Sequence, residues 1–136
     1  MRSVLMILSV FGVLTGCVAG VDPSLDSAAE MRAAVGRSAH IMAETHTVAR
    51  HPDAVTATIA ARAQQCLDAP TLTETPVGVV LVTRAGASGR VIVVDLGAGA
   101  DGTELTVTRA RAGTEAEAAA ILAWAIGNTG PCPSDR

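Results

Sequence analysis

The sequence contains almost no aromatic side chains. It has no Tyr, and Phe11 and Trp124 are its single Phe and single Trp. Sugar-binding platforms and the energetic centres of many protein interfaces depend on aromatic rings. A dedicated carbohydrate-binding module is therefore excluded, and the core has to be built from Val, Ile, Leu and abundant Ala.

Lysine is also absent, so Arg supplies all ten basic residues, against thirteen acidic ones. The formal net charge is −3 at pH 7. Nucleic-acid binding requires a basic patch that neutralises phosphates, and this composition offers none. Nucleic acid is therefore excluded as a partner.

A long apolar run is missing too. Arg2 precedes an apolar stretch over residues 4–14, interrupted by Ser9 and Gly12. This stretch is too short for a spanning helix, which needs roughly 20 residues. A positive start followed by a short apolar run is the pattern of an export signal.

The apolar stretch ends in Leu14, Thr15, Gly16 and Cys17. This sequence resembles the lipobox of bacterial lipoprotein precursors. The resemblance implies a cleaved signal peptide over residues 1–16, a diacylglycerol on Cys17, a tether over residues 17–22 and one small domain over residues 23–136. The alternative is an ordinary secretory signal cut near residues 19–20.

Val18 follows the lipobox cysteine, where many inner-membrane lipoproteins have Asp. By this resemblance, the lipid on Cys17 holds the protein in the cell envelope, at the periplasmic leaflet of an outer membrane. The lack of Lys beside many Arg and Ala is typical of GC-rich codon usage. Because such organisms include single-membrane bacteria, the surface of a cell membrane is the alternative location.

Two further cysteines, Cys66 and Cys132, remain after Cys17. An exported compartment is oxidising, and an even number of cysteines there indicates a disulfide. Closing so long a loop stabilises a fold by roughly 4 kcal/mol in the chain-entropy model. We predict a Cys66–Cys132 disulfide, with two unpaired thiols as the alternative.

The first half of the domain shows helical periodicity. Apolar residues recur at spacings of three, four or seven over residues 28–49, which predicts an amphipathic helix beginning near Pro23. His51 and Pro52 interrupt it. A second helix is predicted from Asp53 to about residue 68, followed by a linker rich in Thr and Pro.

From residue 77 onward, the apolar residues follow the two-residue period of a β-strand instead of the helical period. Residues 77–82, 91–94 and 105–108 are rich in β-branched side chains, and Gly-rich turns separate them. The capping-box pattern from Thr114 to Glu117 opens a last helix that ends at Gly127. The predicted fold is α+β, with N-terminal helices, a three-stranded antiparallel meander whose second strand is central, and a C-terminal helix.

Residues 97–102, Gly-Ala-Gly-Ala-Asp-Gly, match the dinucleotide-binding fingerprint. That motif requires a helix after it, because the helix N-terminus holds the pyrophosphate. A strand is predicted here instead. We interpret the segment as a hairpin turn and predict no cofactor.

The three histidines, His40, His46 and His51, raise the question of a metal site. On one helix only His40 and Glu44 share a face closely enough to bind one ion, and two ligands make a poor site. We therefore interpret these residues as a solvated helix face and predict no metal.

Ser88 is the candidate nucleophile, but Gly86-Ala87-Ser88-Gly89 is not the nucleophile elbow of hydrolases. A triad of Ser88, a histidine and an acid has no support from spacing. No catalytic residue is assigned, and the chain is predicted not to be an enzyme.

The sequence thus favours a lipid-anchored accessory or protein-binding module at the membrane surface. Its partners would be the membrane, through Cys17, and an envelope protein or a second copy of itself, with the apolar second face of the sheet as the contact. The alternative is a carrier or sensor of a small apolar ligand or lipid. A small hydrolase is a third hypothesis, which needs a histidine beside a nucleophile.

Overall fold

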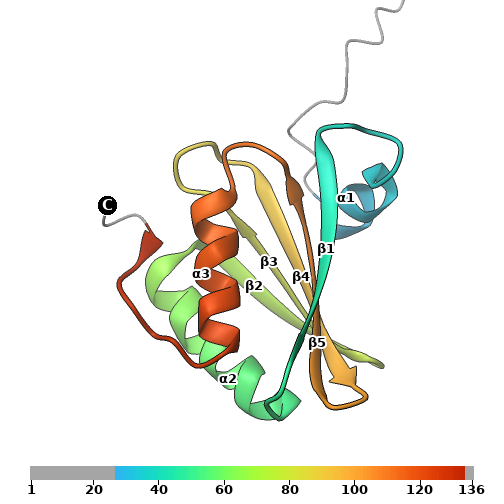
Figure 1. Cartoon of the computed structure of the whole chain (residues 1–136). Coiled ribbons are helices and arrows are strands. Elements are labelled where there is room, and N and C mark those ends of the chain that lie inside the picture. The colour runs from blue at the N-terminus through green and yellow to red at the C-terminus, as the bar shows by residue number, and fades with distance from the viewer. Residues whose placement is uncertain (1–26, 134–136) are drawn as a thin grey trace, which may run out of the picture.

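The computed structural model describes residues 27–133. The predicted signal peptide over residues 1–16, Cys17, the tether over residues 17–22 and the first residues of the predicted domain lie outside the described residues. Within them, the chain forms one five-stranded antiparallel sheet with helices on both faces (Figure 1).

The elements follow one another in the order α1 (Ala28–Ala34), β1 (Ile41–Val48), α2 (Pro52–Cys66), β2 (Asp68–Thr75), β3 (Gly78–Arg84), β4 (Val91–Gly99), β5 (Gly102–Ala110) and α3 (Glu115–Ala125). The strand order across the sheet is β1-β5-β4-β3-β2, and every neighbouring pair is antiparallel. The central strand is β4, and β1 and β2 are the edges.

The predicted fold of N-terminal helices and a three-stranded meander is wrong, although the protein is a mixture of helices and strands. The stretch predicted as one long helix contains only α1, which ends before Gly36 (φ +78°), and then β1. Ile41, Thr45, Thr47 and Val48 favour extended backbone. Because β1 pairs with β5 over its whole length, sheet pairing overrides the weak helical periodicity.

The predicted Thr- and Pro-rich linker is also a strand, β2. Its alternate residues Thr71, Thr73 and Thr75 are β-branched. Pro70 lacks a donor, but an edge strand tolerates this on its free side. The register with β3 is irregular between Asp68 and Thr71, next to that proline.

The main core lies between one face of the sheet and the pair α2 and α3 (Figure 1). Val55 and Ile59 of α2 and Ile121 and Trp124 of α3 are buried there. They pack against the sheet residues Leu81, Ile92, Val94, Leu96, Leu105 and Val107. Trp124, with 1% of its surface exposed, is the largest buried side chain.

The other face, called here the second face, is covered in part by α1. Met31 and Ala34 form a smaller core with Val91, Val93 and other residues at that end of the sheet. Ser27 and Glu30 form a capping box at the start of α1. This one turn of reciprocal hydrogen bonds helps a very short helix to form.

The capping box predicted at Thr114 does not form. The hydroxyl of Thr114 donates to the Ala110 carbonyl (2.6 Å) and accepts from Arg109 (3.1 Å), so it makes no cap for α3. Thr114 is fully buried at the connection between β5 and α3. Its burial there directs the hydroxyl to the strand instead of the helix.

None of the helices in residues 27–133 combines the length and the apolar character that crossing a membrane requires.

Candidate functional site

The structure distributes the three histidines over three different segments. His40 precedes β1, His46 lies within β1, and His51 is the N-cap of α2, where its ring accepts the Asp53 N–H (3.3 Å). The predicted helix that would place His40 and Glu44 one turn apart does not exist. Within residues 27–133, no group of three or more His, Cys, Asp or Glu residues is placed to hold a metal ion.

The glycine-rich segment over residues 97–102 is a hairpin turn, as predicted. Gly99 pairs with Gly102, and Ala100 and Asp101 form the two-residue loop between β4 and β5. A strand follows the segment, so it presents no helix N-terminus to a phosphate.

Ser88 has a structural partner in the turn between β3 and β4. Its hydroxyl donates to the Gly113 carbonyl (2.7 Å) and accepts from the Arg90 N–H (3.3 Å). Arg90 itself donates to the Ala112 carbonyl (2.6 Å). These contacts connect the β3–β4 turn to the segment before α3. They give the Ser88 hydroxyl a structural role in that connection.

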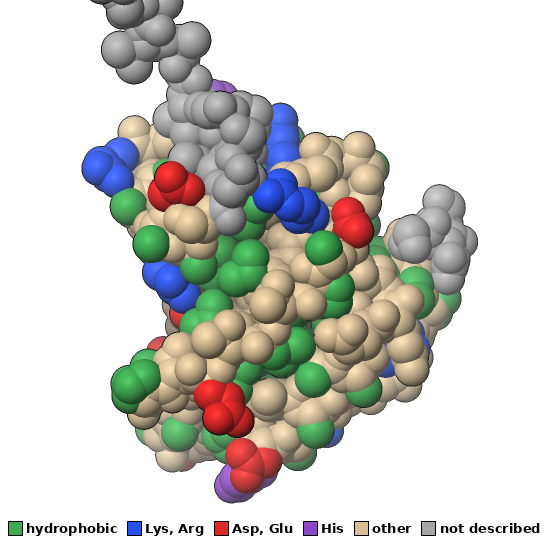
Figure 2. Space-filling model, turned by 180° about the vertical axis from the view of Figure 1, so that it is seen from behind, with side chains coloured by type: hydrophobic (Ala, Val, Ile, Leu, Met, Phe, Trp, Pro, Cys, Tyr) green, Lys and Arg blue, Asp and Glu red, His purple; other side chains and the backbone are tan. Residues whose placement is uncertain are grey.

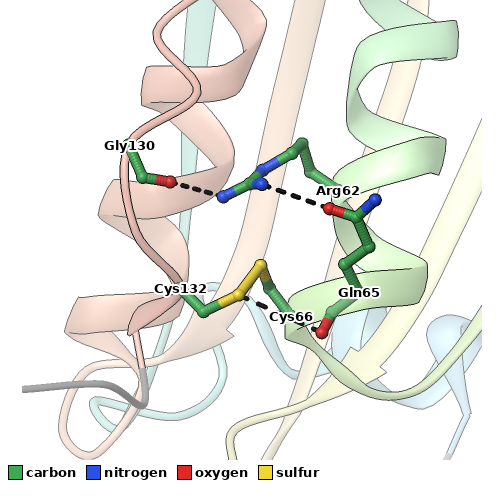
Figure 3. The surroundings of a disulfide bond; sticks show 5 residues. All are labelled: Arg62, Gln65, Cys66, Gly130 and Cys132. Carbon is green, nitrogen blue, oxygen red and sulfur yellow. Dashed lines mark hydrogen bonds between the residues drawn. A yellow bond between two sulfur atoms is a disulfide. The ribbon is translucent and has the colours of Figure 1, made fainter.

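Cys66 and Cys132 form a disulfide, as predicted, with Cα atoms 5.1 Å apart. It joins the end of α2 to the C-terminal segment (Figure 3). Arg62, one turn earlier on α2, donates to the Gly130 carbonyl and to the Gln65 side chain (3.2 Å). The C-terminal segment is therefore fixed against α2 by one covalent bond and one charged hydrogen bond.

The part of the second face that the described residues leave uncovered is a candidate binding surface. The strand registers place one residue of each strand in a row across it, in the order Thr73, Val80, Asp95, Thr106 and Thr45. We call this row the threonine–valine row. The hydroxyls of Thr45 and Thr106 are 3.0 Å apart, so two of its members bond to each other.

A shallow hollow of about 260 Å³ opens beside this row, at the end of the sheet away from α1. Thr75, Val77 and Val80 line one side and Asp95 and Glu104 the other. Val77, in the β2–β3 turn, is 84% exposed. Seen from behind, hydrophobic side chains gather in the middle of the molecule between more polar upper and lower parts (Figure 2).

Asp95 connects this surface to α1. Its carboxylate accepts two hydrogen bonds from the guanidinium of Arg32, at 2.5 and 3.1 Å. The hydrogen bond to Asp95 raises the pKa of Arg32, which burial alone would lower. The pair therefore holds α1 beside the open surface and neutralises the single charge in the threonine–valine row.

Sequence reasoning missed this surface because it assigned its outer strands to a helix and a linker. The alternation of Thr71, Thr73 and Thr75 was the available signal for β2. The second face is less apolar than predicted, because the threonine–valine row contains more Thr than Val. It is also not fully open, because α1 covers one end of it.

No protein-family model, no curated protein and no solved structure matches this chain, so its function has to be inferred from its own residues.

Proposed function

We propose that the protein is a lipid-anchored, non-catalytic binding domain of the bacterial cell envelope. The lipid on Cys17 would hold it at the membrane, at the periplasmic leaflet of an outer membrane or at the surface of a single cell membrane. The uncovered part of the second face would contact another envelope protein.

The observation that carries this proposal is the exposure of Val77 beside the hollow. A valine that is 84% exposed at a turn, next to Val80 and the methyl groups of Thr73 and Thr75, gives a small apolar area within a hydrogen-bonding surface. Apolar areas rimmed by polar groups are typical of protein contact sites. Glu104 gives the rim an acidic side, whereas the charge of Asp95 is neutralised by Arg32.

A non-catalytic role is supported by the separation of the candidate chemical groups. Ser88 is bonded within turns, and the histidines lie on three segments. General acid–base or nucleophilic catalysis requires such groups within hydrogen-bond reach of each other. A binding function requires only the surface that the sheet presents.

The space between the sheet and α2 and α3 bears on the alternative, a carrier of a small apolar ligand. Val55, Ile59, Leu81, Ile121 and Trp124 fill that space with side chains that are 0–1% exposed. No observation on the described residues favours a ligand there, so the protein-binding proposal is preferred.

The anchor is tested by metabolic labelling with a palmitate analogue. The unmodified chain should take up label and the Cys17→Ser variant should not. A Cys132→Ser variant is the matched control, because it also loses a sulfur but keeps Cys17. Equal labelling of the Cys17→Ser variant would refute the lipid anchor.

The binding surface is tested by placing a photocrosslinking amino acid at Val77, Thr73 or, as control, at exposed Gln64 on α2. In the native envelope, Val77 and Thr73 should capture the same protein, identified by mass spectrometry, and Gln64 should not. Capture from Thr73 should fall when Val77 is also changed to Asp. Capture of lipid alone from both positions would instead support the carrier.

A further inference from the structure

The free edge of β1 is a regular strand edge, whose outward backbone groups pair with no other strand among residues 27–133. β1 pairs with β5 in unbroken register over all eight residues from Ile41 to Val48, and no described strand pairs with its other side. Edge strands of this kind are templates for pairing with another chain.

The opposite edge of the sheet, β2, lacks the regular backbone and the unbroken register of β1. Pro70 lies within it, Ala69 has a positive φ of 43°, and its register shifts between Asp68 and Thr71. Prolines and irregular backbone are the devices by which proteins prevent edge pairing. The β2 edge is therefore protected, and the β1 edge is not.

One hydrogen bond fixes which residues of β1 face the free edge. The Arg111 N–H donates to the His40 carbonyl (2.8 Å), in register with the β1–β5 pairing. In an antiparallel pair, every second residue turns both backbone groups toward the partner strand. The even-numbered residues therefore face β5, and Ala43, Thr45 and Thr47 turn their N–H and C=O groups outward.

Two ionisable side chains flank Thr45 on the side of the sheet that carries α2 and α3. Glu44 has 39% of its side chain exposed, and its carboxylate lies 3.6 Å from Arg109. His46 is half-buried, so part of its surface remains exposed. When two copies of β1 lie antiparallel about Thr45, the acid of one copy comes opposite the imidazole of the other.

We propose that a second copy of this chain pairs antiparallel along β1, with the two-fold axis at Thr45. Each Glu44 then lies opposite His46 of the other copy, in a pair without backbone hydrogen bonds, where the Cα atoms are about 4.5 Å apart. The outward N–H and C=O of Thr45 bond to Thr45 of the second copy. The result is one continuous sheet of twice the width.

The pairing of Glu44 with His46 selects this register over its neighbours. A two-fold axis at Glu44 places the two Glu44 side chains opposite each other, and an axis at His46 does the same with the two histidines. Two carboxylates directly opposite each other destabilise a strand pair, whereas a carboxylate opposite an imidazole N–H accepts a hydrogen bond from it. Among these three registers, only the axis at Thr45 forms two complementary pairs.

The second face also fits the pairing. There Thr45 lies opposite Thr45, and Ala43 lies opposite Thr47 of the second copy. These side chains are small and exposed, so they do not block the approach of the second strand. The threonine–valine row then continues from one copy into the other, through the Thr106 and Thr45 pair of each.

A two-fold axis perpendicular to the sheet places α1 of both copies on the same face. The binding surfaces of both copies are then presented side by side on that face. The proposed dimer depends only on pairing along the β1 edge. It requires neither the lipid anchor nor the proposed binding surface.

Cysteine crosslinking of the full chain tests the register. With the axis at Thr45, the two copies of a Thr45→Cys variant have Cα atoms about 5.5 Å apart, within the reach of a disulfide. In an Ala43→Cys variant they are displaced by about 13 Å along the strand. Under mild oxidation, Thr45→Cys should give mainly covalent dimer on non-reducing gels.

The controls are the unmodified chain and the Ala43→Cys and Glu44→Cys variants, which should form almost no covalent dimer on the same non-reducing gels. Ala43→Cys mixed with Thr47→Cys should crosslink to each other. Equal crosslinking at positions 43, 44 and 45, or dimer only at Glu44→Cys, would overturn the proposed register.

A Thr45→Pro variant tests the pairing by a second route. Its missing N–H faces the free edge, so the β1–β5 ladder and the thermal unfolding midpoint should be nearly preserved while the dimer mass in light scattering is lost. Glu44→Pro removes a donor to β5 and should unfold readily. A Thr45→Pro variant that keeps the mass of the unmodified dimer, or an unmodified chain that is monomeric at all concentrations measured, would refute the dimer.

Discussion

The guanidinium carbon of Arg62 lies 5.6 Å from the centre of the Trp124 ring. The same guanidinium donates to Gly130 and Gln65, so one side chain of α2 contacts α3 and the C-terminal segment at once. The Cys66–Cys132 disulfide lies one turn further along α2. Arg62 thus completes the packing of a corner where three segments meet.

We predict that Arg62→Met destabilises the protein by about 1–2 kcal/mol. Met keeps an apolar stem against Trp124 but loses the cation–π contact and the charged hydrogen bond to Gly130. Urea unfolding measures this directly, because Trp124 is the single Trp and reports on its own environment. The control is Arg37→Met, since among the described residues the Arg37 guanidinium donates only to the nearby Ala33 carbonyl, four residues earlier in the chain. Equal stability of both variants would contradict the role assigned to Arg62.

The disulfide gives a second prediction. It closes a loop with a sequence separation of 66, for which the chain-entropy model gives roughly 4 kcal/mol. The Cys66→Ser, Cys132→Ser double variant should therefore lose about 2–4 kcal/mol of unfolding free energy. Reductant should lower the stability of the unmodified chain and leave the double variant unchanged. An unaltered urea midpoint in the double variant would show that the bridge does not constrain the unfolded chain.

The two effects should be coupled. Without the bridge the C-terminal segment is free to leave α2, so the Arg62 contact with Gly130 is weakened. Arg62→Met should then cost less in the double variant than in the bridged protein.

The sequence predicted most reliably the features that depend on neighbouring residues. The second helix was predicted to begin at Asp53, one residue after its observed start, and the Gly-rich stretch at residues 97–102 forms the expected hairpin. The pairing of Cys66 with Cys132 followed from the predicted export and from the even number of cysteines after Cys17. Each of these rests on local backbone chemistry or on a simple count of cysteines.

The edges of the sheet could not be predicted in this way. Met42, Glu44 and His46 are only half-buried, so β1 lacks the clean apolar alternation of an inner strand. Its partner β5 lies some sixty residues away in sequence, as the pairing of Thr45 with Thr106 shows. The candidate binding surface spans both edges, and for that reason it became visible only in the folded chain.

A pH dependence is predicted from Glu115 in the first turn of α3. Hydrogen bonds from its own backbone N–H and from the N–H of Thr114 lower the pKa of its carboxyl group, against a smaller opposing effect of burial. A lowered folded-state pKa means that the ionised group stabilises the fold above its ordinary pKa. This contribution is lost as the pH falls through the lowered value.

Glu115→Gln should therefore be less stable than the unmodified chain at neutral pH, and the difference should shrink as the pH is lowered to about 3. Urea midpoints over a pH series check this. A Glu115→Gln variant whose stability runs parallel to that of the unmodified chain at every pH would show that the carboxylate contributes nothing to folding.

The turn between β2 and β3 provides the last prediction, because Gly78 holds the exposed Val77 in place. Gly78 has a φ of 155°, and a Cβ atom added there would lie 1.9 Å from the Leu96 carbonyl oxygen of β4. Gly78→Ala must therefore separate β3 from β4 locally, and we expect a loss of at least about 2–3 kcal/mol. Gly36→Ala is the matched control, since Gly36 also has a positive φ of 78° but no atom within 4 Å of the added Cβ. That variant should lose only about 1 kcal/mol. Thermal unfolding of both variants measures the difference, and equal losses would show that the close approach of Gly78 to β4 is not what fixes this turn.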